Sequence, residues 1–98
     1  MTIDDLRATL AGAAPPAGLA PPLAALWHDA RGDWDRAHRT VMDTGGPEAA
    51  WVHAYLHRKE GDLDNARYWY RKARQPAGDG PLEAEWAAIA VALLRLGR

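Results

Sequence analysis

The chain has 98 residues, of which 48% are hydrophobic and 26% are charged, a balance that predicts one soluble folded domain and excludes a disordered chain. The formal net charge of -1 gives no reason to expect a nucleic acid or a membrane surface as a partner. The absence of cysteine excludes disulfides and thiolate metal sites. Together with an acidic start unlike a signal peptide, it predicts a cytoplasmic protein.

The first half of the chain is expected to be helical, because its apolar residues recur with helical rather than strand spacing. Thr2 and Asp5 have the spacing of a capping box, which predicts a short capping helix over about residues 2–12. A proline-rich connector follows. Residues 21–44 then read as two helices separated by a glycine, with Asp33 as the N-cap of the second helix.

The second half repeats this organisation. Residues 47–75 predict another pair of helices, broken at Gly61, with Asp62 or Asp64 as the cap of the second helix. After a loop, apolar residues at helical spacing predict a C-terminal helix over about residues 81–96. The whole chain, 1–98, is therefore expected to form a single all-α domain.

An internal repeat supports this organisation. Residues 24–38 and 53–67 align with an offset of 29, and six of the 15 aligned positions are identical. The identical pairs are Ala25/Ala54, His28/His57, Gly32/Gly61, Asp33/Asp62, Asp35/Asp64 and Ala37/Ala66. The glycine ends one helix and the first aspartate caps the next, so the hairpin turn is in register in both copies.

The second unit resembles a tetratricopeptide repeat, and more distantly the Sel-one-like repeats. The matching positions are Gly61, Asp62, Ala66, Tyr70, Ala73 and Pro76, with Ala54 as the small residue of the first helix. The offset of 29 is shorter than the roughly 34 residues of that family. The resemblance implies a short α-solenoid of two helix–turn–helix hairpins, flanked by N- and C-terminal helices.

The same resemblance implies a protein-binding function. First-helix positions of the family often line a concave groove, and here they correspond to Trp51, Tyr55, Arg58 and Lys59. Aromatic residues and arginine dominate binding hot spots. We therefore expect a non-catalytic adaptor for an unidentified protein or peptide, in which these four residues contact the partner.

A histidine pair offers an alternative function. His53 and His57 are four residues apart and so share one helix face, which suits a transition metal or another small ligand. His28 has the repeat-equivalent position to His57 and is the expected third member. The competing interpretation is that these histidines are packed and hydrogen-bonded without any metal.

Three further expectations concern surfaces and chemistry. Arg67, Arg71 and Arg74 share a face of the predicted fourth hairpin helix, which suits an acidic peptide or phosphate, or else forms a solvated face paired with nearby acids. The leucine-rich C-terminal helix allows a homodimer. No catalytic signature or cofactor motif is present, so neither an enzyme nor a cofactor is expected.

Overall fold

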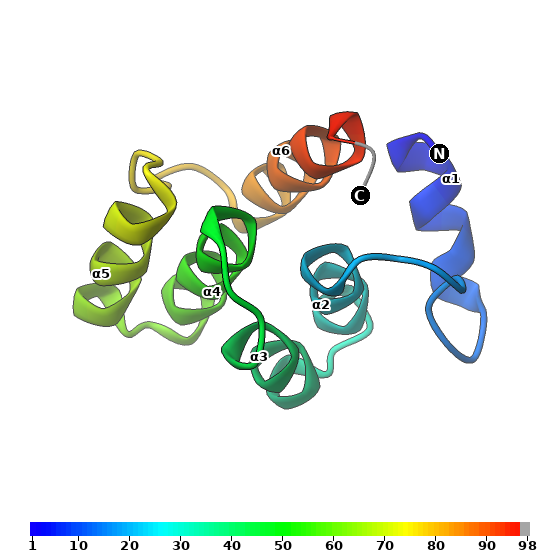
Figure 1. The fold of residues 1–98 in the computed structure, drawn as a ribbon, viewed down its shortest axis with the longest axis horizontal. Coiled ribbons are helices and arrows are strands. Elements are labelled where there is room, and N and C mark those ends of the chain that lie inside the picture. Colours follow the sequence, from blue (N-terminus) through cyan, green and yellow to red (C-terminus); the bar gives the residue numbers. More distant parts are fainter. Residues whose placement is uncertain (97–98) are drawn as a thin grey trace.

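The computed structural model describes residues 1–96, and within that range the chain is all-helical with no strand, which confirms the predicted all-α class (Figure 1). The last two residues of the predicted 1–98 domain lie outside the described residues. Among residues 1–96, no helix has both the length and the apolar character needed to cross a bilayer. The helices are α1 (Ile3–Ala8), which continues into a 3-10 turn (Thr9–Ala11), α2 (Pro21–Ala30), α3 (Trp34–Met42), α4 (Pro47–Glu60), α5 (Leu63–Ala73) and α6 (Leu82–Arg95).

Capping residues set the starts of several helices. Thr2 and Asp5 form the predicted capping box at α1, with both reciprocal hydrogen bonds present. Asp33 caps α3, and Asp62, rather than Asp64, caps α5 by accepting from the backbone N–H three residues later. Gly61 has a φ of 93° between α4 and α5, a left-handed conformation that an L side chain would strain.

The helices form two hairpins, α2–α3 and α4–α5, which pack side by side (Figure 1). The contact between them is made chiefly by α3 and α4, with a smaller contribution from α2. Helix α6 lies across α2 and α4, and α1 packs against α6. The two hairpins are therefore covered on one side by the terminal helices.

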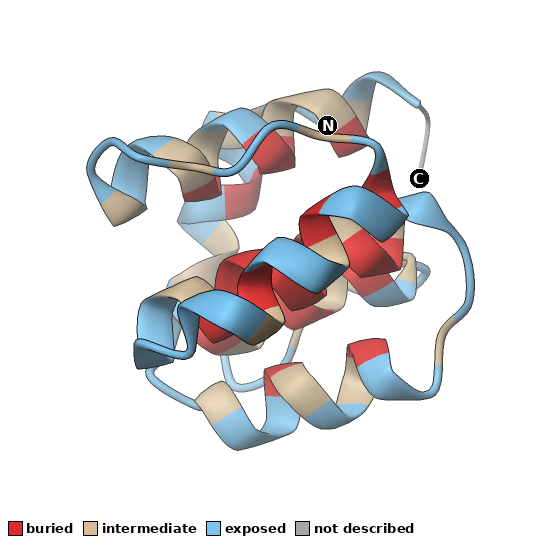
Figure 2. Cartoon of the chain, turned by 90° about the vertical axis from the view of Figure 1, so that its left-hand side faces the viewer, coloured by how far each residue is buried: buried red, intermediate tan, exposed pale blue. Residues whose placement is uncertain are grey.

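The main core lies between α2, α4 and α6. Figure 2 shows buried residues facing the interior while most outward-facing residues are exposed. The largest fully buried side chains are Leu6, Leu23, Leu26, Val52, Leu56, Ile89 and Leu93. A smaller cluster between α4 and α5 contains Ala54, Ala66 and Tyr70, whose two small residues allow the helices to approach closely.

Polar contacts fix α6 on the hairpins. The indole N–H of Trp86 donates to the carbonyl oxygen of Leu26 at 2.9 Å. Glu85 accepts from Arg58 at 2.6 Å and from the hydroxyl of Tyr70, and the Arg58 and Glu85 side chains are only 14% and 11% exposed. Because these contacts join α6 to both α4 and α5, the C-terminal helix is an integral part of the domain.

Candidate metal centre

Three histidines meet where the two hairpins pack. His38 comes from α3, and His53 and His57 come from consecutive turns of α4. The Nε2 atoms of His38 and His53 are 3.1 Å apart, and one ligand nitrogen from each ring lies within 4.8 Å of the others. His53 and His57 are each 5% exposed, whereas His38 is half-buried. We call these three residues the histidine cluster.

His57 is oriented by two partners on opposite sides of its ring. Its Nδ1 lies 2.6 Å from Oε2 of Glu60, and because an ionised carboxylate can only accept, this nitrogen donates the proton. Its Nε2 lies 3.3 Å from the amide nitrogen of Asn65, so it accepts with its lone pair. A carboxylate on the far nitrogen of an imidazole is the usual outer-shell arrangement around metal-binding histidines.

Two tryptophan rings hold the other histidines. The indole of Trp69 stacks on His53 with ring centroids 4.0 Å apart, and Trp34 stacks on His38 at 4.8 Å. Trp34 is itself anchored, because its indole N–H donates to the carbonyl oxygen of Leu56 at 2.8 Å. These contacts restrict ring rotation, so the cluster is assembled from preorganised side chains.

The electrostatic environment favours neutral imidazoles. Burial lowers the pKa of His53 to about 4, with repulsion from His57 and His38 as smaller causes. Burial also lowers the pKa of His38, and the neighbouring His57 adds to that effect. A neutral imidazole is the form that binds a metal ion. His38 and His53 therefore favour the neutral, metal-binding form.

The spacing of the cluster approaches that of a metal site. Two nitrogens bound to a tetrahedral zinc ion at about 2.0–2.1 Å are roughly 3.3 Å apart. The Nε2 atoms of His38 and His53 are close to this distance, and one ring nitrogen of His57 lies within 4.8 Å of a ring nitrogen of each of the other two. Glu60 and Asp62 also come within 4.8 Å of His57 at the exposed edge of the site, where they form a second, more open donor group.

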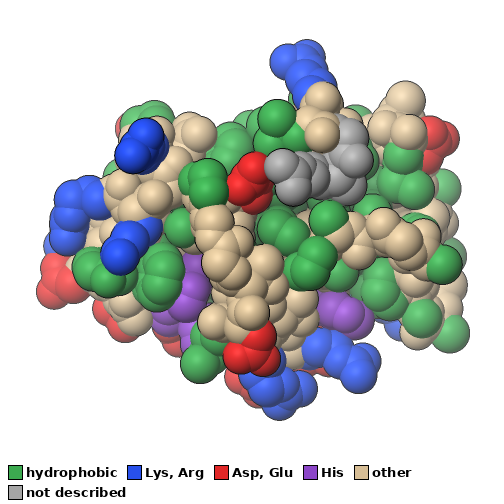
Figure 3. All heavy atoms as spheres, viewed as in Figure 1, with side chains coloured by type: hydrophobic (Ala, Val, Ile, Leu, Met, Phe, Trp, Pro, Cys, Tyr) green, Lys and Arg blue, Asp and Glu red, His purple; other side chains and the backbone are tan. Residues whose placement is uncertain are grey.

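His28, the expected third member, lies elsewhere, and His38 takes its place in the cluster. His28 lines a small depression with residues 13–15 of the connector, together with Arg31 and Arg36. Figure 3 shows histidine side chains, in purple, at two separate places on the face of the molecule in view. The physical reason is that repeat-equivalent residues are related by the displacement of one repeat: His57 faces the preceding hairpin, and His28 faces the segment before α2.

The sequence did contain a signal for His38. The second helix of one hairpin normally packs on the first helix of the next, so residues on the inner face of α3 meet α4. Trp34 and His38 are four residues apart on that face. Searching α3 for a histidine opposite His53 and His57 would have identified His38, whereas matching equivalent repeat positions selected His28.

The four expected partner-binding residues have separate environments. Tyr55 is 2% exposed, and Trp51 is half-buried against the core. Arg58 is paired with Glu85 and also donates to the carbonyl oxygen of Gly80. Lys59 lies 3.0 Å from the buried carboxylate of Asp29. Much of the surface that these residues were expected to offer is therefore occupied by α6 and the loop before it.

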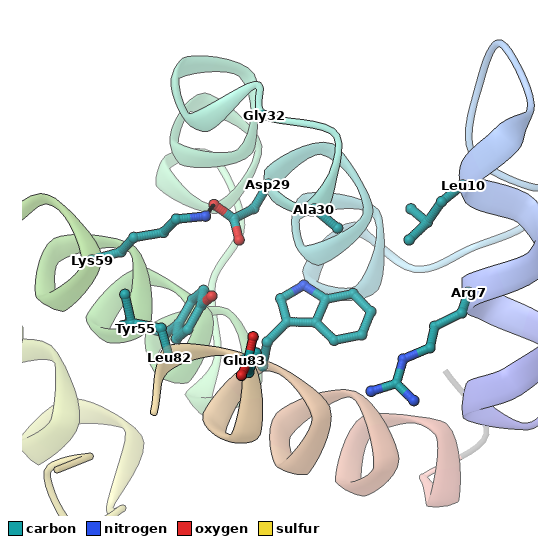
Figure 4. Close-up of a pocket in the computed structure, with 10 residues that line it drawn as sticks. Arg7, Leu10, Asp29, Ala30, Gly32, Tyr55, Lys59, Leu82 and Glu83 are labelled. Carbon is teal, nitrogen blue, oxygen red and sulfur yellow. Dashed lines mark hydrogen bonds and ion pairs between the residues drawn. The ribbon is translucent and has the colours of Figure 1, made fainter. Parts of the chain in front are cut away.

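A cleft remains beside α6. It has a volume of about 600 Å³ and lies between α1, α2, α4 and α6. Figure 4 shows Lys59 pointing toward Asp29 at one end and Arg7 at the other. The remaining lining residues are Leu10, Ala30, Gly32, Tyr55, Leu82, Glu83 and Trp86. Two of the four residues expected to bind a partner, Tyr55 and Lys59, thus line one concave surface.

Arg67, Arg71 and Arg74 have different local surroundings in the structure. Arg67 pairs with Asp64 one turn earlier, as the solvated-face interpretation predicts. Arg71 is exposed, and Arg74 ends α5 in a left-handed conformation with a φ of 59°. Arg74 instead lines a groove of about 380 Å³ with Trp51 and the exposed Leu96.

Comparison with known proteins identifies no family for this chain. It matches no family model, no curated protein and no solved structure. The features of the molecule that bear on its function are therefore the histidine cluster and the cleft.

Proposed function

We propose that this protein binds a first-row transition metal ion through His38, His53 and His57. The observation that carries the proposal is the convergence of three imidazoles from two hairpins, with one ligand nitrogen from each within 4.8 Å of the others. Packing alone gives little reason for this choice of residues, because burying His53 and His57 and half-burying His38 costs more desolvation than burying apolar side chains of similar size.

The donor set narrows the identity of the ion. Neutral imidazoles suit zinc, copper, nickel, cobalt and iron, whereas calcium and magnesium prefer oxygen ligands. Glu60 supports this choice, because it contacts Nδ1 of His57, so an ion would bind Nε2 in place of the hydrogen bond from Asn65. Such an ion would join α3 to α4, so its simplest role is to tie the two hairpins together.

The proposal is tested by metal analysis of untagged protein. After chelation and dialysis against zinc, cobalt, nickel or copper, the wild type should retain one ion per chain, and the His53→Gln/His57→Gln double variant should retain none. The alternative is a packed histidine cluster that needs no metal. That alternative predicts substoichiometric metal in the wild type and no change in thermal stability on adding any of the four ions.

The cleft supports a second candidate function, a tetratricopeptide-like adaptor that binds a peptide in the cytoplasm. The exposed guanidinium of Arg7 lies 5.9 Å from the Trp86 ring, beside Leu10. An acidic side chain of the peptide would pair with Arg7 while its apolar neighbour contacts Leu10 and Trp86. The predicted two-hairpin solenoid would then bind its partner beside α6 rather than in an open groove.

The adaptor proposal has a direct test. Arg7→Glu should abolish capture of an acidic partner from lysate, while Arg71→Glu, an exposed arginine remote from the cleft, should leave capture intact. Equal capture by both variants would contradict binding in the cleft.

Homodimerisation through α6 is a separate proposal, supported by the 55% exposure of Leu96 at the end of that helix. Sedimentation showing a monomer would contradict it.

A further inference from the structure

We propose that the metal ion at the histidine cluster keeps its fourth coordination position open for water or a small anion, and that the side-chain amide of Asn65 donates a hydrogen bond to this ligand. The inference deepens the proposed function and rests on it. It assigns an exogenous ligand class and a positioning residue to the site, neither of which follows from metal binding alone.

The nearby acids are badly placed to supply a fourth ligand. Glu60 contacts Nδ1 of His57, and the two nitrogens of an imidazole face opposite directions, so this carboxylate lies behind the ring relative to an ion on Nε2. Asp62 is used as the N-cap of α5. In the part of the chain that the structure describes, no other acid, histidine or cysteine joins the three imidazoles.

The side-chain amide of Asn65 lies beside the nitrogen that would bind the ion. Its Nδ2 is 3.3 Å from Nε2 of His57, the nitrogen whose lone pair the ion would take. An ion on that lone pair takes the place of the amide hydrogen, so the amide must shift, and a ligand on the ion supplies it with a new acceptor. The first turn of α5 fixes the position of Asn65, because its backbone N–H is bonded to Asp62 at 3.3 Å.

Access to this position is from the α3–α5 side. His53 and His57 are buried, while His38 and Asn65 are half-buried. A ligand therefore reaches the ion past His38 and Asn65. The stacked rings of Trp34 and Trp69 limit its size. Three imidazole ligands carry no negative charge to balance a divalent ion. The site therefore favours a small anion or hydroxide over a neutral fourth ligand.

The inference is tested with cobalt(II)-loaded protein in chloride-free buffer. Sodium azide is titrated into the wild type, into Asn65→Leu, which removes the amide at similar size, and into Asp64→Ala, a matched control at the exposed neighbouring position. The visible absorption of cobalt reports coordination. We expect azide to change the spectrum of all three proteins, with at least about tenfold weaker affinity in Asn65→Leu, the effect of one hydrogen bond to a charged ligand.

The outcomes separate this inference from the metal site itself. Stoichiometric cobalt uptake with a spectrum that azide does not alter would overturn the open position while leaving the metal site intact. An azide response present only in Asn65→Leu would show that the asparagine is itself the fourth ligand, which also overturns the inference. Equal azide affinity in wild type and Asn65→Leu would overturn the role of the amide. Absence of cobalt uptake would overturn both proposals.

Discussion

Glu60 contacts the histidine cluster at Nδ1 of His57, 2.6 Å from its carboxylate. Replacing it by glutamine removes the negative charge of the carboxylate that accepts from Nδ1 and orients the ring. We therefore expect Glu60→Gln to weaken metal binding about 10- to 100-fold, the usual effect of losing an outer-shell partner. Calorimetric titration measures this change. Glu83→Gln on α6 is the control, and equal affinities for the two variants would contradict the role of Glu60.

The low pKa of His53 predicts how stability depends on pH in the metal-free protein. Its ordinary pKa of 6.5 applies in the unfolded chain, and burial lowers the folded value to about 4. The unfolded state therefore binds more protons between these values, and the free energy of unfolding must fall as pH decreases from 6.5 toward 4. Above pH 6.5 this contribution is fully present.

Urea unfolding of chelated protein between pH 7 and pH 5 measures this dependence, in a window above most carboxylate titrations. The wild type should lose stability across the window, and His53→Gln should show a shallower dependence because it lacks the titrating group. Parallel curves for the two proteins would contradict the assignment of the effect to His53.

At the scale of the element, the start of α5 depends on one capping aspartate. Asp62 accepts from the backbone N–H of Asn65, whereas Asp64 makes only an exposed pair with Arg67. Asp62→Ala should therefore cost about 1 kcal/mol of unfolding free energy, and Asp64→Ala should cost less than about 0.5 kcal/mol. Urea unfolding compares the two, and similar losses would argue against a special role for the cap.

The attachment of α6 depends on Glu85. Its carboxylate accepts from both Arg58 and Tyr70, and removing it leaves the largely buried guanidinium of Arg58 without its charge partner. Glu85→Ala should destabilise the protein by about 3 kcal/mol, the range for a broken buried ion pair. Glu83→Ala, an exposed neighbour on the same helix, should change stability by less than about 0.5 kcal/mol. An equally small effect of Glu85→Ala would show that α6 is held by apolar contacts alone.

Local signals in the sequence predicted the helical elements well, because helix ends depend on nearby residues. The capping box at Thr2 and Asp5 and the turn at Gly61 need no information from the rest of the chain. The packing of α6 across α2 and α4 was not predicted, because it depends on contacts distant in sequence, such as that between Trp86 and Leu26. For the same reason the histidine pair on α4 was identified from its spacing alone, whereas recognising His38 as its partner also required that α3 packs on α4.

For the whole molecule, the histidine cluster lies at the contact between the two hairpins, with His38 on the first and His53 and His57 on the second. An ion that binds all three stabilises only the folded arrangement. At a free concentration 100 times its dissociation constant, it adds about 2.7 kcal/mol, which corresponds to a Tm increase of about 10 °C or more in a domain of this size. Thermal unfolding with metal and with chelator measures the increase, and identical Tm values would contradict it.

The most direct test of the metal centre compares two histidines of different position. Zinc binding is measured by calorimetry for wild type, His38→Gln and His28→Gln, since His28 lies outside the cluster. We expect one ion per chain with equal affinity for wild type and His28→Gln, and an affinity lower by more than about 100-fold for His38→Gln. Absence of binding by the wild type, or unchanged affinity in His38→Gln, would contradict it.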